Sequence, residues 1–301
     1  MLECVINISE GRRPEVLAAV ATACGPALLD VHTDADHNRS VFTLAGRTAD
    51  EVSEAAIALA RATVERVDMS GHSGVHPRIG AVDVVPFVPI EPVRMEQAAE
   101  AARAWGARVA DELGVPIFFY GPADPKGRTL PDIRRTAFRE RQPDFGPPEP
   151  HPTAGAMAVG ARPFLVAINW ELAAGGKGLE ADVEVARAVA QEVRERDGGL
   201  PGVRALGFML ASRGQAQVSM NLVDLAATGL EAACTAVRAE AQQRGVHVAA
   251  VELVGLVPGA ELRRCSREFL DWAGLGPEST IEARLAASRS SPSPTDLQAG
   301  P

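Results

Sequence analysis

The order of strand-like and helix-like segments is the feature that most restricts how this chain can fold. In the second half, the segments follow the order strand, helix, strand, strand, helix, strand. That order is the ferredoxin-like βαββαβ arrangement, in which both helices lie on one face of a sheet. The predicted segments are 163–170, 180–196, 203–211, 216–222, 228–244 and 246–253.

The first half of the chain repeats this order and then adds a helix at 92–113 and a strand at 116–120. Pro86 and Pro89 lie within its last common strand, and proline cannot donate to a strand ladder, so we expect that strand to be broken or at a sheet edge. The six common segments are predicted at 2–8, 14–24, 27–32, 40–45, 49–68 and 82–90.

These patterns predict a mixed α/β (α+β) protein with two ferredoxin-like subdomains, at 1–162 and 163–285. Because helices cover one face of each sheet, the other faces are free to stack, with helices outside and a ligand cleft between them. The stretch 124–162, rich in proline, glycine and arginine, is expected to be a functional or disordered loop. The Ser/Pro-rich end, 286–301, is expected to be a disordered tail.

Charge and hydropathy exclude several classes of function. A net charge of −9 argues against binding to nucleic acid, which needs clustered basic residues. There is no uninterrupted run of about 18 apolar residues, so no membrane span is expected. The chain begins with a strand-like segment instead of a signal peptide, so a cytoplasmic location is expected. Its four cysteines show no CxxC spacing, so neither a zinc knuckle nor a disulfide framework is expected.

A glycine-rich loop between residues 70 and 80 carries the best candidate for chemistry. His72 and His76 are four residues apart, but a metal pair at that spacing needs a helix, which the glycines and Pro77 disfavour. Proton transfer is the better interpretation, because histidine is the usual general acid or base at neutral pH. Pro77 restricts His76 to extended conformations, and Arg78 could attract a carboxylate. For His72 we favour simple hydrogen bonding within the loop.

Two further polar clusters carry less information by themselves. The run 30–39, which includes His37, Asn38 and Arg39, reads as a solvated turn between strands. The run 144–160 contains Gly155 and Gly160 but lacks the Lys-Ser/Thr of a phosphate-binding loop. These residues alone therefore predict an α/β protein with a histidine-bearing loop, and they do not predict a specific function.

The ordered set of short motifs resembles the glutamate formiminotransferase family, including the N-terminal part of animal formiminotransferase-cyclodeaminase. The resemblance spans residues 2 to 285 in family order. The matching motifs are Glu3-Cys4-Val5, Ser9-Glu10-Gly11, Leu28-Leu29-Asp30-Val31, Asn38-Arg39, Asp68-Met69-Ser70, His76-Pro77-Arg78-Ile79-Gly80-Ala81 with Asp83, Tyr120-Gly121, Arg128-Thr129-Leu130-Pro131, Pro143-Asp144-Phe145-Gly146-Pro147, Gly160-Ala161-Arg162, Ala216-Gln217-Val218-Ser219 and Leu253-Val254-Gly255-Leu256-Val257-Pro258.

The resemblance implies which residues form the site. The family's catalytic histidine corresponds to His76, and Asn38 is a candidate substrate-binding residue. Arg39, Arg78 and Arg162 become candidates for binding the glutamate carboxylates or the folate tail. The family's folate-contacting segment corresponds to ten residues whose two ends match the family and whose middle departs from the animal pattern. These are Gly146, Pro147, Pro148, Glu149, Pro150, His151, Pro152, Thr153, Ala154 and Gly155.

The resemblance also implies the reaction, which belongs to histidine degradation and one-carbon metabolism. The formimino group of N-formimidoyl-L-glutamate would move to N5 of tetrahydrofolate, giving 5-formimidoyltetrahydrofolate and L-glutamate. Tetrahydrofolate is then a co-substrate, no metal is expected, and the enzyme is a possible homodimer. His76 would accept the N5 proton, and His72 or His37 could assist it.

Two alternatives remain at this point. One is an enzyme that uses 5-formyltetrahydrofolate, either as a formyl donor to glutamate or in a cyclisation. The other is a non-catalytic folate-binding ferredoxin-like module, because a fold does not fix a function. The sequence His76-Pro77-Arg78 favours an enzyme over the module.

Overall fold

Two ferredoxin-like subdomains make up the chain in a computed structural model that describes residues 1–173 and 178–290, and this confirms the predicted fold. The first subdomain begins with the predicted βαββαβ order and continues with further helices and strands. Its elements are β1 (Leu2–Ile8), α1 (Pro14–Cys24), β2 (Leu28–Asp34), β3 (Arg39–Gly46), α2 (Ala49–Val64), β4 (Val82–Pro89), α3 (Met95–Leu113), β5 (Ile117–Tyr120), α4 (Leu130–Thr136) and β6 (Met157–Ala161).

The strands of the first subdomain form one sheet in the order β2-β3-β1-β4-β6-β5. β4 is therefore a central strand, antiparallel to β1 and parallel to β6, and the prediction that its prolines place it at an edge is wrong. The pairing between β1 and β4 skips the position where Pro86 would face Val5, so the missing N–H falls in a gap of the ladder. The sheet tolerates the proline for this reason.

The loop predicted at 124–162 contains two elements that the sequence did not reveal, α4 and β6. α4 has only seven residues and is capped by Thr129, whose hydroxyl accepts from the backbone N–H of Asp132. β6 is short and consists mostly of alanine and glycine, so it carries little strand signal. Ile133 of α4 packs against Phe118 and Tyr120, which attaches the helix to the sheet.

The second subdomain has an antiparallel sheet in the ferredoxin-like order β10-β7-β9-β8. Its elements are β7 (Val166–Leu172), α5 (Leu179–Val193), β8 (Val203–Leu210), β9 (Gln215–Leu222), α6 (Leu230–Gln243) and β10 (Val248–Val254). Three unpredicted helices follow: α7 (Gly259–Leu262), α8 (Arg267–Ala273) and α9 (Ile281–Ser290).

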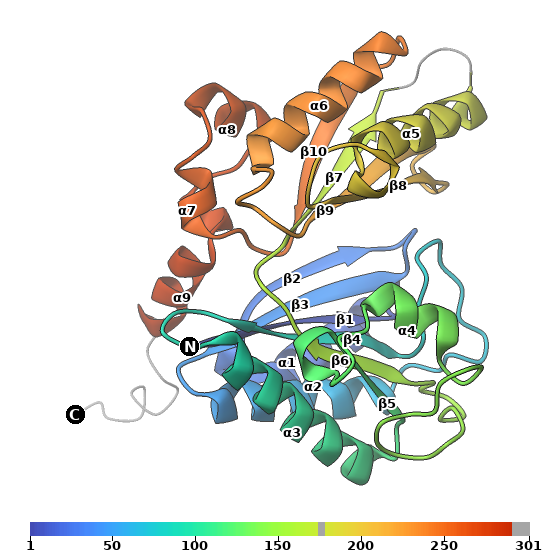
Figure 1. Cartoon of the computed structure of the whole chain (residues 1–301), viewed down its shortest axis with the longest axis vertical. Coiled ribbons are helices and arrows are strands. Elements are labelled where there is room, and N and C mark those ends of the chain that lie inside the picture. Colours follow the sequence, from blue (N-terminus) through green and yellow to red (C-terminus); the bar gives the residue numbers. More distant parts are fainter. Residues whose placement is uncertain (174–177, 291–301) are drawn as a thin grey trace.

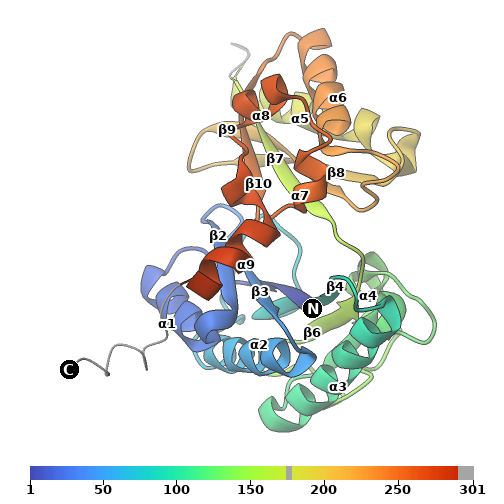
Figure 2. The same ribbon diagram turned by 90° about the vertical axis from the view of Figure 1, so that its left-hand side faces the viewer.

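The chain returns to the first subdomain at its C-terminal end (Figure 2). Ile281 of α9 packs with Leu29 and Ala45 of the first subdomain and with Leu256, which follows β10. The tail predicted from residue 286 therefore begins inside a helix that runs to Ser290, and 291–301 lie outside the described residues.

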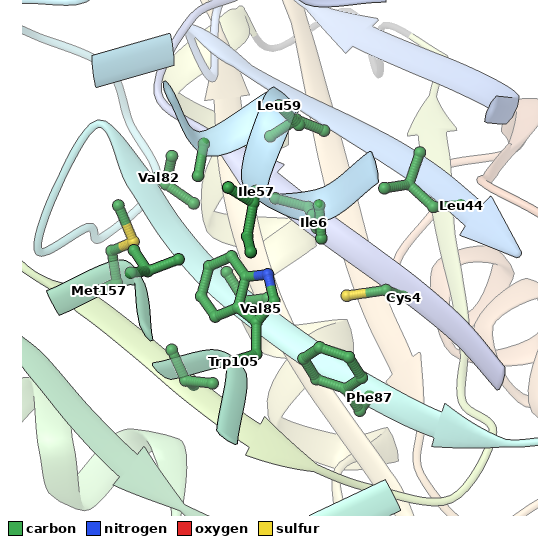
Figure 3. Close-up of a cluster of buried hydrophobic side chains, with 14 of the residues drawn as sticks. Cys4, Ile6, Leu44, Ile57, Leu59, Val82, Val85, Phe87, Trp105 and Met157 are labelled. Carbon is green, nitrogen blue, oxygen red and sulfur yellow. The ribbon is translucent and has the colours of Figure 1, made fainter. Parts of the chain in front are cut away.

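The two sheets face each other, with α1, α2 and α3 outside one sheet and α5 and α6 outside the other (Figure 1). Each sheet buries one face against its own helices and leaves the other turned toward the second sheet. In the first subdomain the core joins Cys4 and Ile6 of β1, Phe87 of β4, Leu59 of α2 and Trp105 of α3 (Figure 3). None of the helices in the described part of the chain is long and apolar enough to cross a membrane.

Trp105 provides a test of this core, because its side chain is only 2% exposed. Trp105→Ala should reduce the free energy of unfolding by about 3–5 kcal/mol, as expected for a large buried aromatic residue. Urea unfolding measures the loss. Trp272→Ala is the matched control, since Trp272 is 39% exposed and should lose clearly less. Equal losses in the two variants would contradict the assignment of Trp105 to the core.

Candidate active site

A cavity of about 450 Å³ lies between the two sheets, as the cleft predicted from the sequence requires. β1 shows how the strands create it: Cys4 and Ile6 point into the hydrophobic core, while the alternate residues Glu3, Val5 and Asn7 line the cavity. The opposite wall comes from the second subdomain and combines polar with apolar side chains. Its lining residues include Ala167, Asn169, Arg204, Ser219, Asn221 and Val254.

Polar contacts between two hairpin turns join the subdomains. Asp36, in the β2–β3 turn, accepts two hydrogen bonds from Ser212 in the β8–β9 turn, one from its backbone N–H at 2.9 Å and one from its hydroxyl at 2.5 Å. Arg213 lies 3.3 Å from the carboxylate of Asp34, and His37 bonds with Gln217 at 3.2 Å. Asp34 and His37 line the cavity, so these contacts also form part of its wall.

His76 lines the cavity, from the loop that connects α2 to β4. Its Nδ1 lies 2.8 Å from the carbonyl oxygen of Pro77. Because a carbonyl can only accept, this bond places the imidazole proton on Nδ1 and leaves the lone pair of Nε2 available as a base. The ring lies beside His37 and Phe208, with centroids 6.0 and 6.3 Å away.

The other residues predicted around His76 hold its loop in place. Arg78 donates to the backbone carbonyls of His76, His37 and Asn38 and to Nδ1 of His72. Neither Arg78 nor His72 is among the cavity-lining residues. Asn38 has a positive φ of 46° and connects Gly11 to Ser73 through its side-chain amide. The geometry therefore gives Arg78 and Asn38 a role in shaping the loop.

Asp83 is the residue that connects the loop to the sheet. Asn7 pairs with Val84 and Ile8 with Val82, so Asp83 is the extra residue of a β-bulge, a feature that can redirect a side chain. Its carboxylate is fully buried and accepts from the backbone N–H of Ile79 at 2.8 Å. It also accepts from two arginines in the cavity wall, Arg39 at 2.6 Å and Arg134 at 2.7 Å.

This cluster leaves one positive charge in excess next to His76. Burial alone would raise the pKa of Asp83, but Arg39 and Arg134 outweigh it, so that pKa is lowered and the carboxylate stays charged. Burial lowers the pKa of His76 to about 3, with further contributions from Arg39 and Arg134. The free imidazole is therefore neutral at neutral pH. An anion bound to the arginines would raise the pKa of His76 and strengthen it as a base.

The predicted folate segment, 146–155, packs against the end of the His76 loop and contributes no residue to the cavity lining. Gly155 pairs with Gly80, and Ala154 accepts a hydrogen bond from the backbone N–H of Ala81. A Cβ at Gly80 would lie 2.1 Å from the backbone oxygen of Ala156, so only glycine permits this close approach. Contacts of this segment with folate stay a prediction.

The end of the cavity away from His76 holds a second group of charges. Glu3 is 3% exposed and lines the cavity, and no described residue forms a hydrogen bond or ion pair with its carboxylate. Burial raises the pKa of Glu3 to about 7, while Arg162 partly offsets the rise and Glu282 adds to it. Arg162 also lines the cavity and donates to the carbonyl of Pro163.

Sequence reasoning missed several of these residues. Arg134 belongs to a helix that was not predicted, and nothing local connects it to His76. Glu3 had a usable signal, because it is the charged member of the alternating Glu3, Val5, Asn7 row on a strand that is otherwise apolar. Within the described ranges 1–173 and 178–290, no three His, Cys, Asp or Glu side chains gather closely enough to hold a metal ion.

Comparison with known proteins agrees with the sequence motifs. Residues 1–162 match the family described as "Formiminotransferase domain, N-terminal subdomain", and residues 177–276 match "Formiminotransferase domain". The glutamate formimidoyltransferase of Thermoplasma acidophilum is 36% identical, over 95% of this chain and 97% of the relative. The glutamate formimidoyltransferase of Streptococcus pyogenes serotype M1 is 38% identical, over 90% of this chain and 93% of the relative. The formimidoyltransferase-cyclodeaminase of Sus scrofa is 40% identical over 86% of this chain, which spans 50% of the pig protein.

The buried carboxylate of Glu3 predicts a pH-dependent cost to stability. Its pKa is near 4.5 in an unfolded chain and about 7 in the fold, so the folded state is penalised increasingly as the pH rises from 4.5 past 7. Glu3→Gln should therefore raise the free energy of unfolding at pH 8, by up to about 3 kcal/mol, and have little effect at pH 4.

Urea unfolding at the two pH values measures this difference, with Glu96→Gln as the control. Glu96 is exposed on α3, so its replacement should change stability little at either pH. An equal effect of Glu3→Gln at pH 4 and pH 8 would show that its buried charge is not the cause.

Proposed function

The chain belongs to the formiminotransferase family, and we infer that it is a folate-dependent enzyme that transfers the formimino group of N-formimidoyl-L-glutamate to N5 of tetrahydrofolate. The products are 5-formimidoyltetrahydrofolate and L-glutamate. The observation that carries the assignment to this site is the neutral imidazole of His76, which lines a cavity between the sheets next to two arginines.

His76 has the protonation state that the first step needs. N5 of tetrahydrofolate attacks the amidine carbon of the donor, and the new C–N bond gives a tetrahedral intermediate. The Nε2 lone pair of His76 accepts the proton that N5 loses. The imidazolium then returns this proton to the nitrogen of glutamate as the old C–N bond breaks. Transfer in both directions leaves His76 neutral again for the next turnover.

Arg39 and Arg134 are suited to bind a carboxylate of the donor. Both guanidinium groups contact Asp83, whose single negative charge offsets only one of them. The three side chains together therefore carry a net positive charge that can attract an anion. A carboxylate bound there would place the amidine near His76 and raise the pKa of the imidazole. The base would then be strengthened only when the donor is present.

Asp83 supplies the geometry for these steps as a positioning residue. One oxygen holds the backbone of Ile79, three residues after His76, and the other holds both arginines. Base and carboxylate site are therefore fixed relative to each other, which is how enzymes gain from proximity and orientation. The contacts of 146–155 with folate, the cytoplasmic location and the homodimer stay predictions from the sequence.

Replacement of His76 tests the proposed base. His76→Ala should lower kcat by about 10²–10⁴-fold with little change in KM, because it removes proton transfer and leaves the arginines in place. The measurement is glutamate release from formimidoylglutamate in the presence of tetrahydrofolate. His247→Ala is the control, since His247 is exposed and outside the cavity. Wild-type turnover by a folded His76→Ala enzyme would rule out this role.

Replacement of Arg134 tests the electrostatic coupling to His76. Arg134→Gln removes a cation near the imidazole, so the pKa of His76 should rise from about 3 toward its ordinary value. The KM for formimidoylglutamate should rise as well. NMR titration of the imidazole, assigned by comparison with His76→Ala, measures the first effect, and steady-state kinetics measure the second.

The control for this experiment is Arg135→Gln on the same helix. Arg135 is exposed and pairs with Asp132, so its loss should leave both the pKa of His76 and the KM unchanged. Identical titration curves for Arg134→Gln and the wild type would contradict the coupling.

A further inference from the structure

We propose that the two hydrogen bonds from Ser212 to Asp36 act as a latch, which closes the cavity at its His76 end and holds Phe208 of the second subdomain beside His76. The proposal rests on the proposed function and extends it, because it assigns the step by which substrates enter and leave the site. Neither Asp36 nor Ser212 lines the cavity, so both are positioning residues.

The two covalent connections between the subdomains lie at the opposite end of the cavity. The chain crosses between β6 and β7 and returns after β10. Phe164 of the first connection and Leu256 of the second belong to one apolar cluster with Leu29, near the start of β2. The end of β2 lies about 16 Å further along the strand, and Asp36 is in the turn beyond it. In the first subdomain, connections and latch are therefore at opposite ends of the same strand.

The second sheet has the same arrangement. Val166, the first residue of β7, pairs with Leu222, the last residue of β9, so the first connection enters at that end of the sheet. Ser212 lies in the turn before β9 and is therefore at the other end. A rotation about the two connections separates Ser212 from Asp36 and opens the cavity at the latch end.

The contacts at the latch end are mostly polar, whereas those at the connections are apolar. Among the clusters of buried apolar residues in 1–173 and 178–290, only the one around Leu256 contains residues of both subdomains. At the latch end the subdomains meet through the latch, an ion pair of Arg213 and a hydrogen bond of His37. Water can replace a hydrogen-bond partner at a small net cost, so the cavity opens more easily at this end.

The β2–β3 turn connects the latch to the catalytic loop. The side chain of Asp36 binds Ser212, while its backbone carbonyl accepts from the N–H of Val75, the residue before His76, at 3.4 Å. Across the cleft, Phe208 lies on β8, the strand that leads into the turn of Ser212, and its ring centroid is 6.3 Å from that of His76. The closed form therefore places an apolar ring beside the base, where it excludes water.

Amide hydrogen exchange tests whether the latch acts across the cavity. Ser212→Ala removes the hydroxyl bond from the second subdomain, and it should speed exchange in the His76 loop, residues 70–80, of the first subdomain. Asp36→Ala removes both bonds and should speed this exchange further. Asp36→Asn should stay close to the wild type, because its amide accepts from the backbone N–H of Ser212 and donates to the hydroxyl.

Dissociation of tetrahydrofolate tests whether the latch controls ligand exchange. Burial alone would raise the pKa of Asp36, but the bonds from Ser212 and the charge of Arg213 outweigh it, so the carboxylate is charged and its hydrogen bonds are strong. Because a bound ligand leaves from the open form, Asp36→Ala should raise the dissociation rate constant at least about tenfold, measured by stopped-flow fluorescence.

Asp224→Ala is the matched control for both measurements. Asp224 also accepts two hydrogen bonds in an exposed turn, but both come from backbone N–H groups of its own subdomain. Its replacement should change neither the exchange of residues 70–80 nor the dissociation rate of tetrahydrofolate.

Two results would overturn the proposal. Unchanged exchange of residues 70–80 in Ser212→Ala would show that the latch does not hold the His76 loop. Unchanged dissociation of tetrahydrofolate in Asp36→Ala would show that ligands do not leave through this end. Circular dichroism checks that each variant folds, and Ser212 is in an exposed turn where loss of a hydroxyl is well tolerated. The exchange measurement needs no ligand, so it tests the latch even if the wild type fails to release glutamate, which would reject the proposed function.

Discussion

The buried carboxylate of Asp83 organises the site, because three separate segments of the chain meet at it. A β-bulge directs it away from the regular ladder, and it then holds Ile79 of the His76 loop, Arg39 of β3 and Arg134 of α4. A buried charge is stable only when such partners compensate for its lost hydration. The same requirement that keeps Asp83 charged therefore fixes the base and the anion-binding arginines relative to each other.

The cavity between the sheets carries charged residues at both ends, and the charges at the two ends differ. At the His76 end, burial and the excess positive charge of the two arginines lower the pKa of the imidazole and keep it neutral, and a bound anion would raise that pKa again. At the other end, Glu3 carries a raised pKa and has no partner among the described residues. Both arrangements cost stability in the empty protein and become favourable when ligands supply the missing partners. Such local conflicts with stability are typical of functional sites.

Most of the architecture could be predicted because strand and helix patterns are local. The order of the six common elements in each half was confirmed, and α1 was predicted to the residue. The errors occurred where tertiary pairing overrides local preference. β4 is central because a gap in its ladder accommodates Pro86, and β6 forms between two neighbours despite its weak strand composition. α4 is held by packing of Ile133 and is too short to show a helical period.

By itself the sequence determined the subdomain order, the motifs that identify the family, and His76 as the candidate base, since each depends on residues close together in the chain. Only the tertiary structure decided that Arg78 holds the loop, that Arg134 reaches the site and that Glu3 faces the cavity with no hydrogen-bond or ion-pair partner within 1–173 and 178–290. These roles depend on which carbonyls, carboxylates and empty spaces surround each side chain. The surroundings come from segments dozens of residues apart, and they exist only once the two sheets have formed and faced each other.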